Sequence, residues 1–419
     1  MDVTPAHLSA AADALDALLP LDRPADVVLS TWFRSRPRLG ARDRAFIADA
    51  VFAVLRHLRR LEAVTGTRAA RKLLLAALVL VQGRAVRSLS AATGAEESRW
   101  LSELKAADTA LPAAVRFSLP DWLYDALVAT LPPDALEPLA RKMLVPAPLD
   151  LRVNTLRANR EEVIATLNAE GIEAIATALS PIGIRLAGKP ALERHALFTG
   201  GQVEVQDEGS QLVAYLMQAK RGEMVVDFCA GAGGKTLALG AMMRSEGRLY
   251  AFDTSDRRLA NLKVRLKRSG LSNVHPQLIA SETDARIKRL AGKIDAVLVD
   301  APCSGTGTLR RNPDLKWRMN PDAIVELGTK QGNILASAAR LPKIGGRLVY
   351  ATCSLLPDEN ERVVETFLAA HPGWKRMDVG PVLARQGIAV TAEANGMLRL
   401  YPHVHGTDGF FAALLERHA

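Results

Sequence analysis

The first part of the chain has the apolar spacing of packed helices. Over residues 1–145 apolar side chains recur every three or four positions, and in "DRAFIADAVFAVLRHLRRL" one stripe is formed by Phe46, Ala50, Val54 and Leu58. The longest apolar run, "LLLAALVLV", is far shorter than the roughly 20 residues that span a bilayer. We therefore expect an all-α domain over residues 1–145, with this run as a buried helix.

The pattern changes after the prolines of "LVPAPLDLRVNT", which we interpret as a linker. "LDLRVNT" alternates between apolar and polar residues like a strand, and "NREEVIATLNAEG" reads as a helix that ends at Gly171. "GIEAIATAL" and "GIRLAG" have the composition of short strands. These features predict a small α+β module over residues 146–203.

Five strand-like runs rich in apolar residues follow, and helical segments separate them. They are "EMVVDFC", "GRLYAFD", "VHPQLI", "KIDAVLVD" and "GGRLVYATC". Continuous apolar strands that alternate with helices are typical of a parallel sheet covered on both faces. Residues 204–419 are therefore predicted to form an α/β domain.

Composition adds a basic charge balance. Fifty-four Lys and Arg against 45 Asp and Glu give a net charge of +9, which favours a polyanionic partner such as nucleic acid. The arginine clusters at 34–44 and 56–60 could follow a phosphate backbone or form solvated faces.

Three cysteines without a C-x-x-C pair fit neither a disulfide framework nor a zinc site. The amino-terminal segment lacks the basic start of a signal peptide, so we expect a cytoplasmic protein.

A glycine-rich turn, "VVDFCAGAGGKT", joins the first of the five strands to a helix. A phosphate-binding P-loop would need glycine where Cys229 stands, and a dinucleotide fingerprint would need glycine where Thr236 stands. Asp227 precedes the turn and Asp253 closes the next strand, where a ribose hydroxyl would need an acceptor. S-adenosylmethionine has a ribose and no phosphate, so this arrangement suits that cofactor.

Three residues around this turn have a structural alternative. Asp253 could cap the following helix, although Thr254 or Ser255 could do so instead. Asp284, in "SETDARI", could hold the adenine amino group of the cofactor or cap a helix. We expect the Cys229 side chain to pack beneath the turn while its backbone lines the site.

The other two cysteines each follow a strand. Cys303 lies in "DAPCSGTG" and Cys353 in "YATCSLLPDENE". In an open α/β sheet the ligands bind beyond the carboxyl ends of the strands, so both thiols should face the cofactor crevice. Packing in the core is the usual role of cysteine, but these turns are rich in Pro, Ser, Gly and Thr, and such loops carry function more often than core.

A thiol beside a methyl donor suggests pyrimidine chemistry. Carbon 5 of a pyrimidine is a poor nucleophile until a thiolate adds to carbon 6 and makes carbon 5 electron-rich. The base must be single-stranded or extruded to be reached. After transfer, a base must remove the carbon 5 proton, and a second thiol could help the first to leave. The spacing alone allows either thiol to attack.

These motifs resemble the RNA cytosine-5 methyltransferases, most strongly the bacterial 16S rRNA methyltransferase B-like branch. The matching stretches are "DFCAGAGGKT", "DAPCSGTGTLRRNPDLKW" and "YATCSLLPDENE", with support from "VQDEGSQL" and "HGTDGFF". They cover the catalytic region in the family's order. The helical first domain also looks like the RNA-binding domain, related to an antitermination factor, that this branch carries.

The resemblance implies a role for each matching position. Cys353 would be the nucleophile, Cys303 would assist release of the methylated product, and Asp300 would contact the target base or the cofactor. The fold would be a Rossmann-like class I S-adenosylmethionine-dependent methyltransferase domain with an all-α first domain and a small α+β module. The cofactor would be bound by Cys229, Ala230, Gly231, Ala232, Gly233, Gly234, Lys235 and Asp253, with Asp284 at a position where "ASETDAR" departs from the family pattern.

The resemblance also implies partners and leaves alternatives. Arg310, Arg311 and Lys316 would meet the RNA backbone near the active site. We expect a monomer that acts on RNA, most strongly 16S rRNA, away from membranes. Transfer RNA remains an alternative substrate, and a non-catalytic ribosome-assembly factor an alternative function. DNA cytosine-5 methyltransferases share the chemistry with the thiols exchanged, because their nucleophile is the Pro-Cys cysteine.

Overall fold

The computed structural model describes residues 3–107 and 111–419, and the chain divides into two compact units. Unit 1 comprises residues 1–146 and 308–321, and unit 2 comprises residues 147–307 and 322–419. The pattern of the sequence did not predict that residues 308–321 belong with the helical unit. Within the described residues, no helix is both long and apolar enough to cross a membrane.

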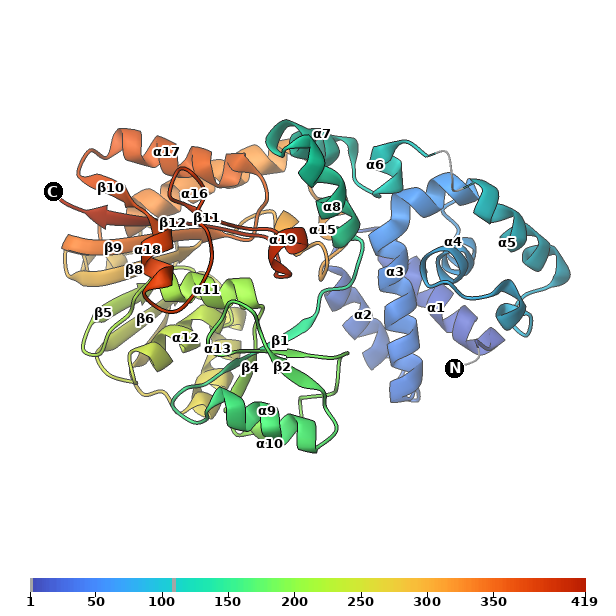
Figure 1. Ribbon diagram of the computed structural model, residues 1–419, viewed down its shortest axis with the longest axis horizontal. Coiled ribbons are helices and arrows are strands. Elements are labelled where there is room, and N and C mark those ends of the chain that lie inside the picture. Colours follow the sequence, from blue (N-terminus) through green and yellow to red (C-terminus); the bar gives the residue numbers. More distant parts are fainter. Residues whose placement is uncertain (1–2, 108–110) are drawn as a thin grey trace. The chain divides into compact units, whose positions relative to one another are not determined.

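Unit 1 is helical throughout its described part (Figure 1). The buried side of α3 carries the predicted apolar stripe, and the predicted buried helix is α4 continued by the π-helical turn η1 (Ala77–Val81). The α-helices are α1 (Pro5–Leu18), α2 (Ala25–Arg34), α3 (Ala41–Thr65), α4 (Ala70–Ala76), α5 (Ala95–Ala107), α6 (Ala113–Arg116), α7 (Asp121–Thr130), α8 (Pro133–Met143) and α15 (Leu315–Arg318).

Helix α3 is irregular at His57, where φ is −111° and ψ is 18°. Beyond this point the Arg59 N–H donates to Ser118 Oγ at 3.0 Å. The Leu55 carbonyl, which is the regular helical partner of that N–H, accepts the indole N–H of Trp317 at 2.9 Å. Side-chain donors inserted into the helical ladder are a recognised cause of such kinks. The irregular turn therefore anchors the segment 308–321 within unit 1.

Unit 2 begins with a small antiparallel sheet of order β2-β3-β1-β4. The predicted strands and helix are present as β1 (Leu149–Val153), α9 (Arg160–Ala169), β2 (Ala174–Ala176) and β3 (Gly183–Leu186). Helix α10 (Ala196–Thr199) and strand β4 (Val203–Val205) were not predicted. The α9 helix packs its Val163 and Leu167 into the core of this sheet.

The large sheet of unit 2 has the order β10-β12-β9-β8-β5-β6-β7, with β11 paired to β12. The five predicted runs form parallel neighbours: β5 (Met224–Asp227), β6 (Arg248–Asp253), β7 (Val274–Leu278), β8 (Ile294–Asp300) and β9 (Pro342–Thr352). The sheet as a whole is mixed, because β12 (Phe410–Arg417) runs antiparallel to β9, and β10 (Trp374–Met377) and β11 (Leu398–Leu400) pair antiparallel with β12.

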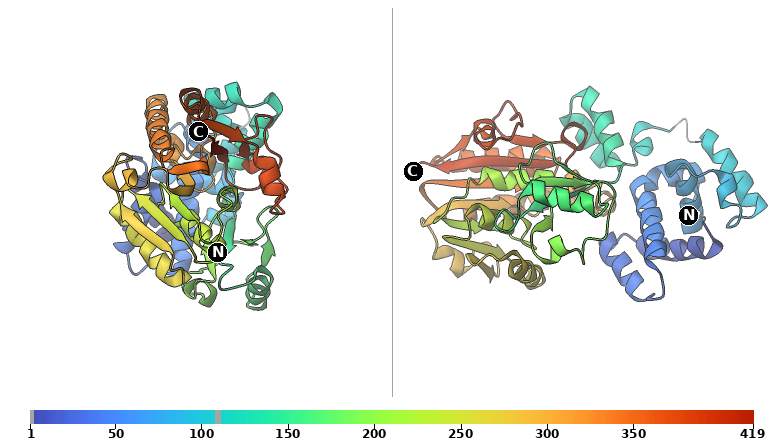
Figure 2. Two further views of the ribbon diagram at one scale, coloured as in Figure 1. Left: turned by 90° about the vertical axis from the view of Figure 1, so that its left-hand side faces the viewer. Right: turned by 60° about the horizontal axis from the view of Figure 1, so that its bottom comes forward.

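Alternate residues of these strands pack on opposite faces of the sheet, where helices cover them (Figures 1 and 2). Val225 of β5 packs with α11 (Glu208–Leu216), α12 (Gly234–Met242), α13 (Asp256–Ser269) and α18 (Val379–Ala384). Its neighbour Val226 packs with α14 (Ala285–Lys288), α16 (Pro321–Ala338) and α17 (Glu361–Ala370). Burial on both faces explains why the strands read as continuous apolar runs.

Candidate active site

The glycine-rich turn lies between the end of β5 and the start of α12. Gly231 and Gly233 have positive φ of 57° and 87°, which favours glycine. A Cβ on Gly233 would stand 2.1 Å from Leu262 Cδ1, whereas a Cβ on Gly231 would meet only open space. The turn is thus packed tightly against α13 on one side and leaves its backbone approachable by a ligand on the other.

Asp227, at the end of β5, is a buried carboxyl group with spare bonding capacity. Its Oδ2 accepts the Thr236 hydroxyl at 2.6 Å, and its Oδ1 has no hydrogen-bond partner within the described part of the chain. Burial, which the Thr236 bond and Lys235 oppose and the charges of Asp300 and Asp253 reinforce, raises the pKa of Asp227 to about 7. A cationic ligand near this carboxyl group would favour its charged form.

Asp253, at the end of β6, touches the same turn. Its Oδ2 accepts the Gly231 N–H at 2.8 Å and its Oδ1 accepts the Ser255 N–H at 2.7 Å. Ser255 is the N-cap of α13, so Asp253 is not the cap. Asp284 does cap a helix, because its two oxygens accept backbone N–H groups and it precedes α14. A contact of Asp284 with a cofactor stays a prediction.

These residues fit a cationic nucleoside such as S-adenosylmethionine. The open backbone at Gly231 offers a cradle for the ligand, and the unpartnered Oδ1 of Asp227 offers a hydrogen-bond acceptor. The carboxylates of Asp227, Asp253 and Asp300 suit a ligand with a sulfonium and an ammonium group. The Cys229 side chain packs partly against the core, and burial raises the pKa of its thiol well above the ordinary range. Cys229 is thus not a nucleophile in this structure.

The other two thiols meet at the carboxyl ends of adjacent parallel strands. Cys303 follows β8 and Cys353 follows β9, and their Sγ atoms lie 3.4 Å apart. Both residues are partly buried. The strand-end placement expected from the sequence therefore brings two residues 50 positions apart into direct contact.

Lys235 joins the glycine-rich turn to the thiols. Its Nζ donates to Asp300 Oδ2 at 2.8 Å and lies 5.3 Å from the centre of the Phe410 ring. Burial alone would lower the pKa of Lys235, but the charge and hydrogen bond of Asp300, with a further contribution from Cys353, raise it above its usual value. The ammonium is therefore retained near Cys353. The sequence had assigned Lys235 to the cofactor alone.

The Cys303 thiol has a different electrostatic environment. Its hydrogen bond to Cys353, burial, and the negative charges of Cys353 and Glu359 raise the pKa of Cys303 well above its ordinary value. Cys303 is therefore held in its protonated form. The charged groups around the two thiols differ, because the Lys235 ammonium interacts with Cys353 and the Glu359 carboxylate with Cys303.

Three residues that bond beside the thiols were not predicted from the sequence. Ser304 and Ser354, which follow the two cysteines, both direct their hydroxyls to Glu359 Oε2 at 2.5 Å. The available signal was the repeated Cys-Ser pair in two separate turns. Glu359 gave no comparable signal, because a glutamate just before a helix usually lies on the surface.

Of the three residues expected to meet the RNA backbone, Arg310 and Lys316 are buried, at only 4% and 3% exposed. Their contact with RNA, like that of Arg311, stays a prediction. The Lys316 ammonium donates to the Arg56 carbonyl at 2.8 Å, and burial lowers the pKa of Lys316 well below its usual value. These side chains are held inside unit 1, whereas Arg311 is partly exposed.

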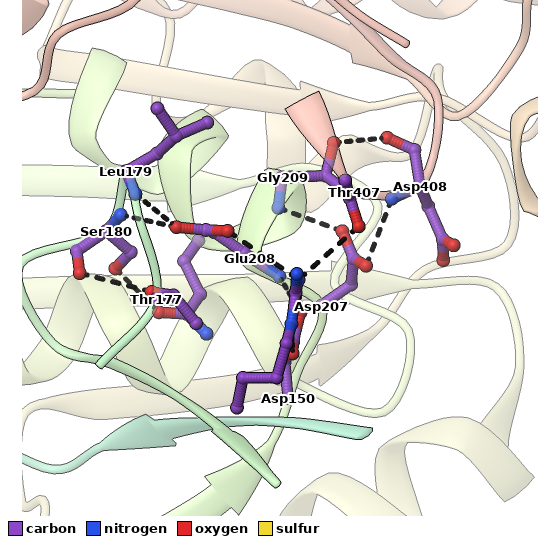
Figure 3. A network of polar contacts seen from close by, with 12 residues as sticks. Asp150, Thr177, Leu179, Ser180, Asp207, Glu208, Gly209, Thr407 and Asp408 are labelled. Atoms are coloured by element: carbon purple, nitrogen blue, oxygen red, sulfur yellow. Dashed lines mark hydrogen bonds and ion pairs between the residues drawn. The ribbon is translucent and has the colours of Figure 1, made fainter. Parts of the chain in front are cut away.

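A buried acidic network joins the stretches "VQDEGSQL" and "HGTDGFF" (Figure 3). Asp150 on β1 accepts both Arg185 and the Glu208 N–H, and Asp207 Oδ2 accepts the Asp408 N–H at 3.1 Å. The network therefore ties the small sheet to helix α11 and to the loop before β12.

That loop continues to the thiols. The Gly409 N–H donates to the Gly307 carbonyl at 2.8 Å, and the Gly307 N–H donates to the Cys353 carbonyl at 2.9 Å. A Cβ on Gly307 would stand 2.2 Å from the Gly409 oxygen, so this close approach requires glycine. The carboxyl-terminal loop thus supports both cysteine-bearing turns.

The fold and the site define a Rossmann-like methyltransferase. Its seven main strands combine five parallel strands with a carboxyl-terminal antiparallel addition, and the site lies at the carboxyl ends of the parallel strands. Among solved structures, a methyltransferase homolog protein from Pyrococcus horikoshii has a TM-score of 0.62 at 30% identity, covering 73% of this chain and 97% of its own. The crystal structure of PH0851 has a TM-score of 0.81 at 28% identity and covers 100% of both chains.

Sequence comparison identifies the family. Residues 214–416 match the family described as 16S rRNA methyltransferase RsmB/F, and residues 119–193 match the ferredoxin-like domain of RsmF/B-like methyltransferases. A probable ribosomal RNA small subunit methyltransferase B from Synechocystis sp. is 38% identical over 304 residues, which is 72% of this chain and 67% of the relative. The chain belongs to the 16S rRNA methyltransferase RsmB/F family.

Proposed function

We propose that the protein transfers a methyl group from S-adenosylmethionine to carbon 5 of a cytosine in 16S rRNA, in the cytoplasm, through a covalent cysteine adduct. The observation that carries this proposal is the pair of thiols, 3.4 Å apart, beside the Lys235–Asp300 ion pair. The ribosomal RNA of the small subunit is named in the family to which the chain belongs. When bound, S-adenosylmethionine supplies the electrophilic methyl group.

In this proposal Cys353 begins the reaction. Its thiolate adds to carbon 6 of the cytosine, and the electron pair of the ring double bond moves towards carbon 5, which becomes nucleophilic. The Lys235 ammonium, held by Asp300, stabilises negative charge near this sulfur before attack. Asp300 at the end of β8 contacts the base or the cofactor.

Cys303 acts when the product leaves. A base takes the carbon 5 proton, the ring double bond re-forms, and the electron pair of the carbon–sulfur bond returns to Cys353 Sγ. The S–H of Cys303 then donates a hydrogen bond to the departing sulfur, and the 3.4 Å separation of the two sulfurs, with the raised pKa of Cys303, supports this step. The protein ends the cycle as it began, with one thiolate and one thiol.

The direct test is methyl transfer from radiolabelled S-adenosylmethionine to unmodified 16S rRNA, followed by bisulfite mapping. The proposal expects label in RNA and one bisulfite-resistant cytosine. Label in transfer RNA alone would establish the alternative substrate. Absence of both cofactor binding and transfer would establish the non-catalytic assembly factor.

We expect cofactor affinity to depend on the ionisation of Asp227. The pKa of this carboxyl group is raised to about 7, and a cationic ligand favours its charged form. Binding of S-adenosylmethionine should therefore strengthen as the pH rises through about 7 and weaken below it. Isothermal titration between pH 5.5 and 8.5 measures this slope, and Asp227→Asn should flatten it. An equal slope in this variant would contradict the assignment.

A further inference from the structure

Glu359 is a fully buried carboxylate, 0% exposed, at the end of the short turn η4 (Pro357–Glu359). Its Oε1 accepts the Ser304 N–H at 2.8 Å and the Gln331 side-chain amide at 3.0 Å. Its Oε2 accepts the hydroxyls of Ser304 and Ser354, each at 2.5 Å. Four neutral donors thus satisfy one buried charge, which would otherwise be costly to bury.

The four donor groups belong to three residues, and each of these residues is connected to a turn that carries a cysteine. Ser304 follows Cys303 and Ser354 follows Cys353, so a single carboxylate joins both turns. Gln331 on α16 also donates to the Pro302 carbonyl at 2.9 Å, which is the residue before Cys303. The Glu359 backbone is held in turn, because the Tyr350 hydroxyl donates to its carbonyl at 2.6 Å.

A neutral side chain could satisfy much of this geometry, because hydroxyl groups can accept as well as donate. A carboxylate at this position has an effect that a neutral side chain would not have. After the Cys353 hydrogen bond, burial and the charge of Cys353, the charge of Glu359 also raises the pKa of Cys303. The charge thus acts on one thiol of the pair, while the Lys235 ammonium acts near the other.

We propose that Glu359 is a positioning residue that holds the two cysteine turns at reacting distance and keeps the Cys303 thiol protonated. The inference rests on the proposed cysteine chemistry and deepens it. A protonated Cys303 donates its hydrogen bond to Cys353 Sγ as the carbon–sulfur bond breaks, so no proton is gained or lost by the pair. Glu359 itself touches neither RNA nor cofactor in this role.

The charge is tested by titrating Cys303 without any methyl acceptor. Protein carrying Cys353→Ala is alkylated with iodoacetamide between pH 6 and 11, and modification of Cys303 is followed by peptide mass spectrometry. Adding Glu359→Gln should move the Cys303 profile to lower pH. The matched control is Glu223→Gln. Glu223 pairs with Arg347 and directly precedes β5, at the end of the sheet away from the thiols, so its replacement should leave the pH profile of Cys303 alkylation unchanged. If Glu359→Gln also leaves the pH dependence of Cys303 alkylation unchanged, the charge effect is overturned.

The positioning is tested by kinetics in protein with both cysteines. Glu359→Ala should lower single-turnover methyl transfer about 100-fold, the scale expected when reacting groups shift by about 1 Å, and leave KM for RNA within about twofold. Glu359→Gln should fall between this variant and Glu223→Gln. Equal rates for Glu359→Ala and Glu223→Gln would overturn the positioning role.

The two experiments separate this inference from the proposed function. The Cys303 titration needs only folded protein, which circular dichroism verifies for each variant. A wild-type protein that forms no 5-methylcytosine would sink the proposed function, while the titration would still decide whether Glu359 controls the Cys303 proton. If Glu359→Ala does not fold, the Glu359→Gln titration carries the decision alone.

Discussion

Replacing Cys353 with alanine is expected to lower methyl transfer to RNA by roughly 10⁴-fold or more, the scale seen when a covalent nucleophile is removed. Without this thiol no adduct forms at carbon 6, and carbon 5 remains a poor nucleophile. Cofactor binding should persist, because the glycine-rich turn, Asp227 and Asp253 do not depend on the sulfur. Radiolabel transfer under single-turnover conditions measures the rate, and isothermal titration measures cofactor affinity.

The matched comparison is Cys303→Ala, which removes the neighbouring sulfur at 3.4 Å. Both variants leave a similar small cavity at the same edge of the sheet, so a general packing defect would affect them alike. Full activity in Cys353→Ala together with complete loss in Cys303→Ala would show that the roles are exchanged, as in the DNA enzymes. The raised pKa of Cys303 argues against that outcome.

The strands that carry the site were predictable because their apolar runs are local. Burial on both faces demands continuous apolar residues, and β5, β6, β8 and β9 are rich in them, whereas only Val274 of the edge strand β7 is buried in the core. The direction of β12 was not predictable in the same way, because "FFAALLER" reads alike in a parallel or an antiparallel strand. Direction is set by how the chain returns to β9, which the residue pattern does not encode.

The residues of the candidate site likewise fall into those that a local motif predicts and those that it does not. The glycine-rich turn and the two Cys-Ser pairs are short motifs that can be recognised where they stand. The Lys235–Asp300 ion pair joins residues 65 positions apart, and Glu359 meets Ser304 across 55, so neither has a local signature. Only the folded sheet brings these charged groups beside the thiols, so only the structure shows that the two sulfurs have different electrostatic environments.

The location of charged residues in loops was the hardest feature to predict from the sequence. Lys316 and Arg310 were expected to meet the RNA backbone, yet both are buried, although charged side chains are rarely buried. The irregular turn of α3 allows this burial by presenting the Arg56 carbonyl to Lys316, while the Arg56 side chain donates to the Arg310 carbonyl at 3.0 Å. A helix irregularity is not visible in the apolar spacing of "DRAFIADAVFAVLRHLRRL".

Replacing Cys303 with alanine is expected to trap the protein on its RNA. Cys353 can still attack and the methyl group can still be transferred, but the departing sulfur loses the neighbouring thiol that lies 3.4 Å away and would donate a hydrogen bond to it. The carbon–sulfur bond should then break slowly, and a covalent protein–RNA complex should accumulate. A denaturing gel measures this as a retarded, nuclease-sensitive band that carries the radiolabelled methyl group.

The double variant Cys303→Ala with Cys353→Ala separates a covalent complex from tight binding. It should give no retarded band, because the attacking sulfur is absent, although its RNA affinity should match that of the single variant. A band that persists in the double variant would place the covalent bond elsewhere. Free turnover by Cys303→Ala without any adduct would refute the release role, and the 3.4 Å contact between the two sulfurs would then be packing alone.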